Sequence, residues 1–106
     1  MDANLFVSNE IHEKKVTLNK QEVTLYFKEI PAIEFRRYFL IEQSGDIDKQ
    51  IESMPRLIAS SLCNPDGTLA MTVEKAKMLK PTAMVELFKA VLEVNQQGGD
   101  EGKPDE

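Results

Sequence analysis

The chain has 106 residues, which is enough for one domain with a modest hydrophobic core. Hydrophobic residues make up 42% of it and charged residues 29%, a composition that excludes a wholly disordered chain. The net charge of −5 argues against nucleic acid or an anionic membrane as a partner, and no apolar run approaches the roughly 20 residues that cross a bilayer.

The segment from Lys14 to Lys28 alternates between apolar and polar residues with the period of a β-strand. Placing Asn19 and Lys20 at the tip of a two-residue turn sets Val16 opposite Val23. One face of this hairpin is then apolar and carries Val16, Leu18, Val23, Leu25 and Phe27. The sequence therefore predicts a hairpin with one buried side.

A first helix is predicted from about Pro31 to Gln43, with the proline in its first turn, where a missing N–H has no cost. Ser44 and Gly45 end this helix. Its apolar residues spread around more than half of the circumference, so we expect more than one neighbour to cover it.

A second helix is predicted to follow Asp46 or Asp48, either of which can cap its free N–H groups. Apolar residues recur on one face of this helix, at Ile47, Ile51, Met54, Ile58 and Leu62. Pro55 lies within this pattern and costs about 3 kcal/mol in a helix interior, so we expect a kink or two short helices that meet there.

A turn and two further helices complete the predicted fold. Asn64 to Gly67 form the turn, Thr72 caps a short helix from Val73 to Leu79, and a last helix runs from about Pro81 to Asn95. Only a narrow polar stripe interrupts the apolar surface of the last helix, at Thr82, Glu86, Lys89 and Glu93. This pattern suggests a partner or a second copy of the chain, although burial within the same domain would also account for it.

These elements predict an α+β fold, with an N-terminal β-hairpin packed on a mainly α-helical domain of about four helices. We assign residues 1–95 to this single domain. Residues 96–106 hold no apolar side chain and carry four acidic residues and one lysine, so we expect a disordered acidic tail.

Few residues offer catalytic or metal-binding chemistry. Cys63 cannot form an internal disulfide, and neither it nor His12 has a partner at ligand spacing, so we expect a small buried cysteine and a solvent-facing or edge histidine. Asp46 and Asp48 resemble the start of a calcium loop, but Ile51 stands where that loop requires glycine. The sequence therefore predicts no catalytic, metal or cofactor site.

Arg36 and Arg37 are adjacent on the first predicted helix and point about 100° apart, so they form no patch by themselves. Surface salt bridges are the expected role, and contact with an anion or an acidic partner is the alternative. The beginning of the chain lacks the basic and apolar regions of a signal peptide, so we expect an intracellular protein.

The chain resembles the tail assembly chaperones of long-tailed, lambda-like bacteriophages of the siphovirus type. The likeness lies in the apolar helix that ends in Leu62-Cys63-Asn64, the acidic glycine turn, and the closing helix from Leu87 to Asn95. The hairpin and its exit at Pro31-Ala32 are also similar, so the resemblance covers roughly residues 14–95.

This resemblance implies a non-enzymatic chaperone that binds the tape measure protein and helps the tail tube to polymerise around it. It also implies a homo-oligomer in the host cytoplasm that is absent from the mature virion. Contact with the tail tube protein would come from a longer, frameshifted form, and Glu101-Gly102-Lys103 can be encoded by codons that contain a slippery run of bases, although a merely hydrophilic terminus would also account for these residues.

The amphipathic pattern, and not the resemblance, supplies a candidate surface for a partner or for self-association. It is formed by the first and last predicted helices, at Phe35, Tyr38, Phe39, Met84, Leu87, Phe88, Val91 and Leu92. The alternative function is that of a small intracellular dimeric adaptor or regulator of unrelated lineage.

Overall fold

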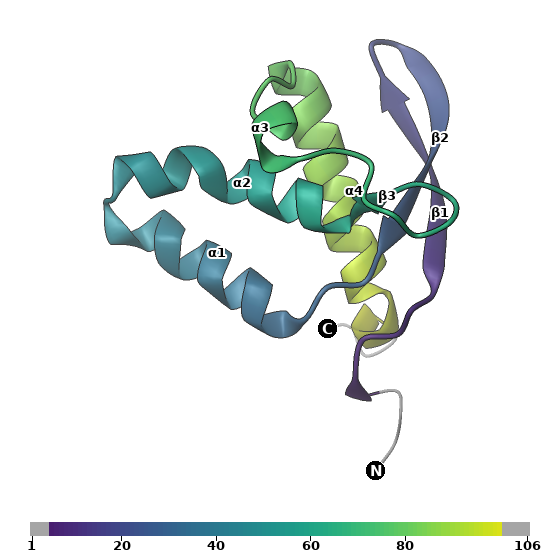
Figure 1. Cartoon of the computed structure of the whole chain (residues 1–106), viewed down its shortest axis with the longest axis horizontal. Helices are drawn as coiled ribbons and strands as arrows, with labels where there is room; N and C mark the ends of the chain where they lie inside the picture. Colours follow the sequence, from purple (N-terminus) through teal and green to yellow (C-terminus); the bar gives the residue numbers. More distant parts are fainter. Residues whose placement is uncertain (1–4, 101–106) are drawn as a thin grey trace.

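The computed structural model describes residues 5–100, with side chains as far as Asn95. Its elements follow in the order β1 (Ile11–Leu18), β2 (Gln21–Lys28), α1 (Ala32–Ser44), α2 (Ile47–Ser61), β3 (Leu62–Cys63), α3 (Val73–Ala76) and α4 (Pro81–Asp100). Figure 1 shows α4 beside the sheet, with α1 and α2 extending from this body as a helical hairpin. The predicted α+β class is confirmed.

The hairpin has the predicted register, because Val16 pairs with Val23 in an antiparallel ladder. Asn19 and Lys20 both adopt positive φ angles, of 53° and 66°, which a two-residue turn needs to match the twist of its strands. The apolar face is turned inward, with Val16 5% exposed and Phe27 fully buried.

A third strand was not predicted. The two residues of β3 pair antiparallel with β2, Leu62 opposite Phe27 and Cys63 opposite Tyr26, so the sheet order is β1-β2-β3. The sequence pattern assigned Leu62 to the second helix, but its backbone is extended, with ψ at 125°. Ser61, the last residue of α2, connects that helix to β2, because its hydroxyl donates to the carbonyl of Lys28 at 2.6 Å.

The core lies where α2 and α4 meet the apolar face of the sheet. Phe27, Ile58 and Val91 come from three different elements and are each fully buried. Around them pack Val16, Ile30, Leu57, Leu62, Leu87, Ala90 and Val94. Burying side chains of this size contributes about 1.5–3 kcal/mol each, so this layer holds the fold together.

Helix α1 begins one residue later than predicted, because Pro31 has an extended backbone and is the N-cap. Gly45 ends the helix in the left-handed conformation, with φ at 80°, and the Asp46 side chain accepts from the Lys49 N–H at 3.3 Å to cap α2. These caps confirm the predicted boundary between the two helices.

Helix α2 passes through Pro55 as one continuous element, which excludes two short helices and leaves a kink as the predicted effect of the proline. The proline is buried, and its ring adds apolar contact where it removes one hydrogen bond. Gln50 of α2 donates to the carbonyls of Ile41 and Glu42 at 3.3 and 3.0 Å, which ties α2 to the last turn of α1.

The last two helices differ from their predicted lengths. Thr72 caps α3 as predicted, but α3 ends at Ala76 rather than at Leu79. Helix α4 continues to Asp100, so residues 96–100, which were expected to belong to a disordered tail, are helical. The rest of the expected tail, residues 101–106, lies outside the described residues. No helix among the described residues is long and apolar enough to span a bilayer.

Candidate partner-binding surface

The candidate surface divides into core residues, partly covered residues and one well-exposed residue. Leu87 and Val91 belong to the core, at 2% and 0% exposed, so no partner reaches them in this chain. Phe39 is 54% exposed. The remaining five are half-buried, namely Phe35, Tyr38, Met84, Phe88 and Leu92.

Part of the candidate surface on α4 is occupied by α1 of the same chain. The rings of Tyr38 and Phe88 lie 5.2 Å apart in a tilted arrangement, and Phe39 meets the edge of Tyr38 at the same centroid distance. Burial raises the pKa of the Tyr38 phenol, and the nearby Glu42 carboxylate raises it further. The structure therefore brings the first and last predicted helices together, but these aromatic residues pack against each other inside the chain and do not form one exposed surface.

Helix α1 is the least covered helix, and none of its residues is fully buried. Two of its apolar residues, Ile33 and Leu40, are 63% and 54% exposed. They stand seven positions apart and therefore share one face of the helix. We expected several neighbours to cover α1, but most of its packing is with α2 alone.

This exposed face borders a hollow of about 480 Å³, which we call the α1 groove. Its apolar lining comes from Ile33, Leu40 and Ile41, and its polar lining from Arg36, Arg37, Ser44, Asp46 and Lys49. Ordinary apolar clefts of this volume accept a few side chains of a partner. The α1 groove thus combines an apolar floor with three basic residues.

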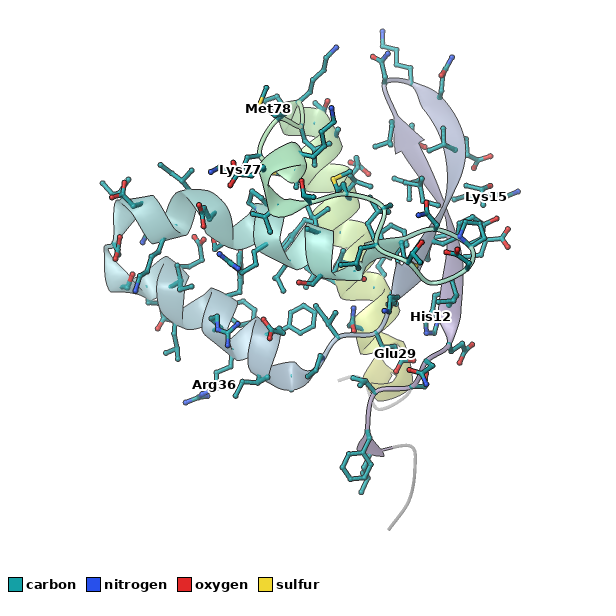
Figure 2. All side chains as sticks on the ribbon, viewed as in Figure 1. His12, Lys15, Glu29, Arg36, Lys77 and Met78 are labelled. Atoms are coloured by element: carbon teal, nitrogen blue, oxygen red, sulfur yellow. The ribbon has the colours of Figure 1, made fainter. Side chains whose placement is uncertain are left out.

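The two arginines of the groove have different surroundings. Arg37 donates to the Glu34 carboxylate at 2.9 Å, which is the predicted surface salt bridge. Arg36 is in no ion pair within the described part of the chain, and Figure 2 shows its side chain extending from α1 into solvent. Its charge is therefore available to an acidic group on a partner.

The apolar stripe of α2 is buried only in its second half. Ile58 is fully buried, whereas Ile47 and Ile51 are 68% and 60% exposed, so the rest of the chain covers only part of the apolar face that the sequence predicted. The N-terminal half of α2 projects beyond α3 and α4, as Figure 1 shows, and packs there against α1. Sequence reasoning did not place Ile33, Leu40, Ile47 or Ile51 in a partner surface, because periodicity identifies an apolar face without showing what covers it.

The residues with metal-binding or nucleophilic chemistry are placed as follows. Cys63 is 4% exposed, and burial raises the pKa of its thiol, which confirms a buried, unreactive cysteine. His12 lies on the edge strand, as expected, but its side chain is only 15% exposed and its Nε2 is 2.9 Å from Glu29 Oε2. Among the described residues, Glu10, His12 and Glu29 are the group whose ligand atoms come within 4.8 Å of one another, a cluster that sequence spacing did not reveal.

Comparison with known proteins gives one match. A family model described as phage tail assembly chaperone, TAC, matches residues 1–95, which include the hairpin, α1, α2 and α4 as far as Asn95. Curated proteins and solved structures yield no match.

Proposed function

The chain belongs to the phage tail assembly chaperone family, and we propose that it binds the tape measure protein of the phage tail and promotes polymerisation of the tail tube around it. The observation that supports this most is the α1 groove, where isoleucine and leucine side chains remain exposed beside basic residues. Because Ile33 and Leu40 are 63% and 54% exposed, a partner that covers them can gain roughly 1–2 kcal/mol from each side chain. We infer a non-enzymatic role.

The groove favours an amphipathic helix as the bound segment. Ile33, Leu40 and Ile41 form a strip along one helix, which matches the anchors that a partner helix presents at intervals of three and four residues. The basic residues at its rim favour acidic side chains beside those anchors. We therefore propose that the tape measure protein binds through a helix with an apolar stripe and acidic flanks.

Substitution of Leu40 tests this proposal. The chain would be co-expressed with the tape measure protein of its own phage, and the soluble complex would be purified through a tag on the tape measure protein. Leu40→Glu should lose the complex, because a charge replaces an apolar anchor without disturbing the core. Val85→Glu is the matched control, since Val85 is 51% exposed on α4 and lies outside the groove.

The results of this experiment distinguish whether the chain binds the tape measure protein from whether the α1 groove is the binding site. If the wild-type chain leaves the tape measure protein insoluble and uncomplexed, the proposed function is wrong. If Leu40→Glu and Val85→Glu both retain the complex, the function stands and the α1 groove is not its site. Circular dichroism on each variant shows whether a loss of binding reflects unfolding.

We propose further that the chain self-associates through the accessible part of the candidate surface. Phe39 is well exposed, with half-buried Phe35, Met84 and Leu92 completing this part of the surface. Light scattering should therefore find an oligomer for the wild type and a smaller species for Phe39→Glu. A strict monomer at high concentration would contradict this proposal.

A frameshift-extended form is proposed as the route to the tail tube protein. Its expected site, at Gly102-Lys103, lies outside the described residues, and the codons of the gene test it directly. We propose the host cytoplasm as the place of action, with the protein absent from the mature virion. Mass spectrometry of purified virions tests the last point, because detection of residues 1–95 in them would refute it.

A further inference from the structure

We propose that Glu10, His12 and Glu29 form a binding site for a divalent metal ion, with Zn²⁺ as the best fit, where the chain passes from the hairpin into α1. Each residue offers one ligand atom, and these atoms lie within 4.8 Å of one another. One imidazole nitrogen and two carboxylate oxygens form a donor set that Zn²⁺ accepts, with water completing the coordination. The proposal is independent of tape measure binding.

The topology of the hairpin brings the three residues together. Glu10 and His12 are two positions apart at the start of β1, which places them on the same side of the chain. His12 pairs with Phe27 across the ladder, and Glu29 follows Phe27 by two positions, just after β2 ends. The open end of the hairpin therefore gathers residues that are far apart in sequence, and Figure 2 shows His12 and Glu29 side by side there.

The distance between His12 and Glu29 requires little change to admit an ion. His12 Nε2 and Glu29 Oε2 are 2.9 Å apart. Ligand atoms held about 2.0–2.1 Å from Zn²⁺ at tetrahedral angles would be about 3.3 Å from each other. An opening of a few tenths of an ångström between these two side chains is within the freedom of their rotamers, since their side chains are 15% and 25% exposed.

Ser8 orients the Glu29 carboxylate and holds the backbone of Glu10. The Ser8 N–H donates to Glu29 Oε1 at 2.9 Å, which leaves Oε2 turned toward His12. The Ser8 hydroxyl accepts from the Glu10 N–H at 3.2 Å and fixes the backbone that carries the third ligand. Outer contacts of this kind commonly hold metal ligands in position.

A metal ion here would connect the N-terminal segment to the base of α1. Glu29 adjoins Ile30, whose N–H donates to the Asn95 side chain of α4 at 2.7 Å. On the other side, Glu10 follows a segment that holds the exposed apolar residues Leu5, Phe6 and Val7. The bound ion would thus link the segment before Glu10 to the start of α1.

Titration of the untagged full chain with ZnCl₂, followed by calorimetry, tests the proposal. The wild type should bind one equivalent and show a higher midpoint of thermal unfolding in its presence. His12→Ala should weaken binding more than about 10-fold and lose the thermal shift, given that even outer-shell changes cost 10- to 100-fold. Glu13→Gln is the control, because Glu13 is exposed on β1 and lies outside the cluster.

Glu10→Gln provides a second variant, since Glu10 is exposed and its replacement leaves the His12–Glu29 pair in place. It should also weaken Zn²⁺ binding. The proposal is overturned if the wild type binds no Zn²⁺, or if His12→Ala and Glu10→Gln bind it as tightly as Glu13→Gln does.

Discussion

Phe27 is the residue whose replacement tests the fold most directly. It is fully buried, pairs with Leu62 of β3, and lies in the cluster that α2 and α4 close from the other side. Burying a phenylalanine side chain contributes up to about 3 kcal/mol, and the cavity left by Phe27→Ala adds to the loss, so we expect a destabilisation of about 3–5 kcal/mol.

Urea unfolding followed by far-ultraviolet circular dichroism measures this loss, because the chain has no tryptophan to report by fluorescence. A domain of this size is stable by about 5–15 kcal/mol, so Phe27→Ala should lower the urea midpoint substantially without a large change in the slope. Thr24→Ala is the matched control on the exposed face of the same strand, and we expect a change within about 0.5 kcal/mol. Equal losses at the two positions would refute the assignment of faces.

Three further predictions concern the turn, the open end of the hairpin and the link to α4. Lys20→Gly should stabilise the chain in urea unfolding, because relieving the left-handed φ of 66° gains about 1–2 kcal/mol and exceeds the roughly 0.5–1 kcal/mol of unfolded-state entropy that glycine adds. A loss of stability would contradict the turn geometry. The hydrogen bond from the Ser8 N–H lowers the pKa of Glu29 in the folded chain, so the charged carboxylate stabilises the fold above its unfolded pKa of 4.5. This stabilisation is lost as the pH falls through the folded pKa. Glu29→Gln should therefore show a smaller difference in melting temperature between neutral and acidic pH than the wild type does. Asn95→Ala should cost about 1–3 kcal/mol, because it leaves the N–H of buried Ile30 without its acceptor. An unchanged urea midpoint would contradict this prediction.

Local patterns in the sequence predicted the hairpin and the helix starts, because these features depend on residues that are close together in the chain. Alternation from Lys14 to Lys28 predicted the hairpin and its register, because side chains on a strand alternate strictly between two faces. The capping residues Asp46 and Thr72 predicted where α2 and α3 begin, because a helix start needs a local acceptor for its free N–H groups. The resemblance to tail assembly chaperones also came from sequence, and the family match confirmed it.

Tertiary structure decided the features that depend on distant segments. The strand β3 has two residues, too few for a periodic signal, and exists because β2 offers them a partner. The sequence pattern placed Leu87 and Val91 in a partner surface and left Leu40 out, yet Leu87 and Val91 are buried in the core while Leu40 is 54% exposed on α1. The cluster of Glu10, His12 and Glu29 forms only when the two ends of the hairpin meet. Hydrophobic periodicity shows which residues share a face of a helix or strand. Whether that face is buried, and which side chains cluster on it, depends on contacts between segments that are far apart in the chain.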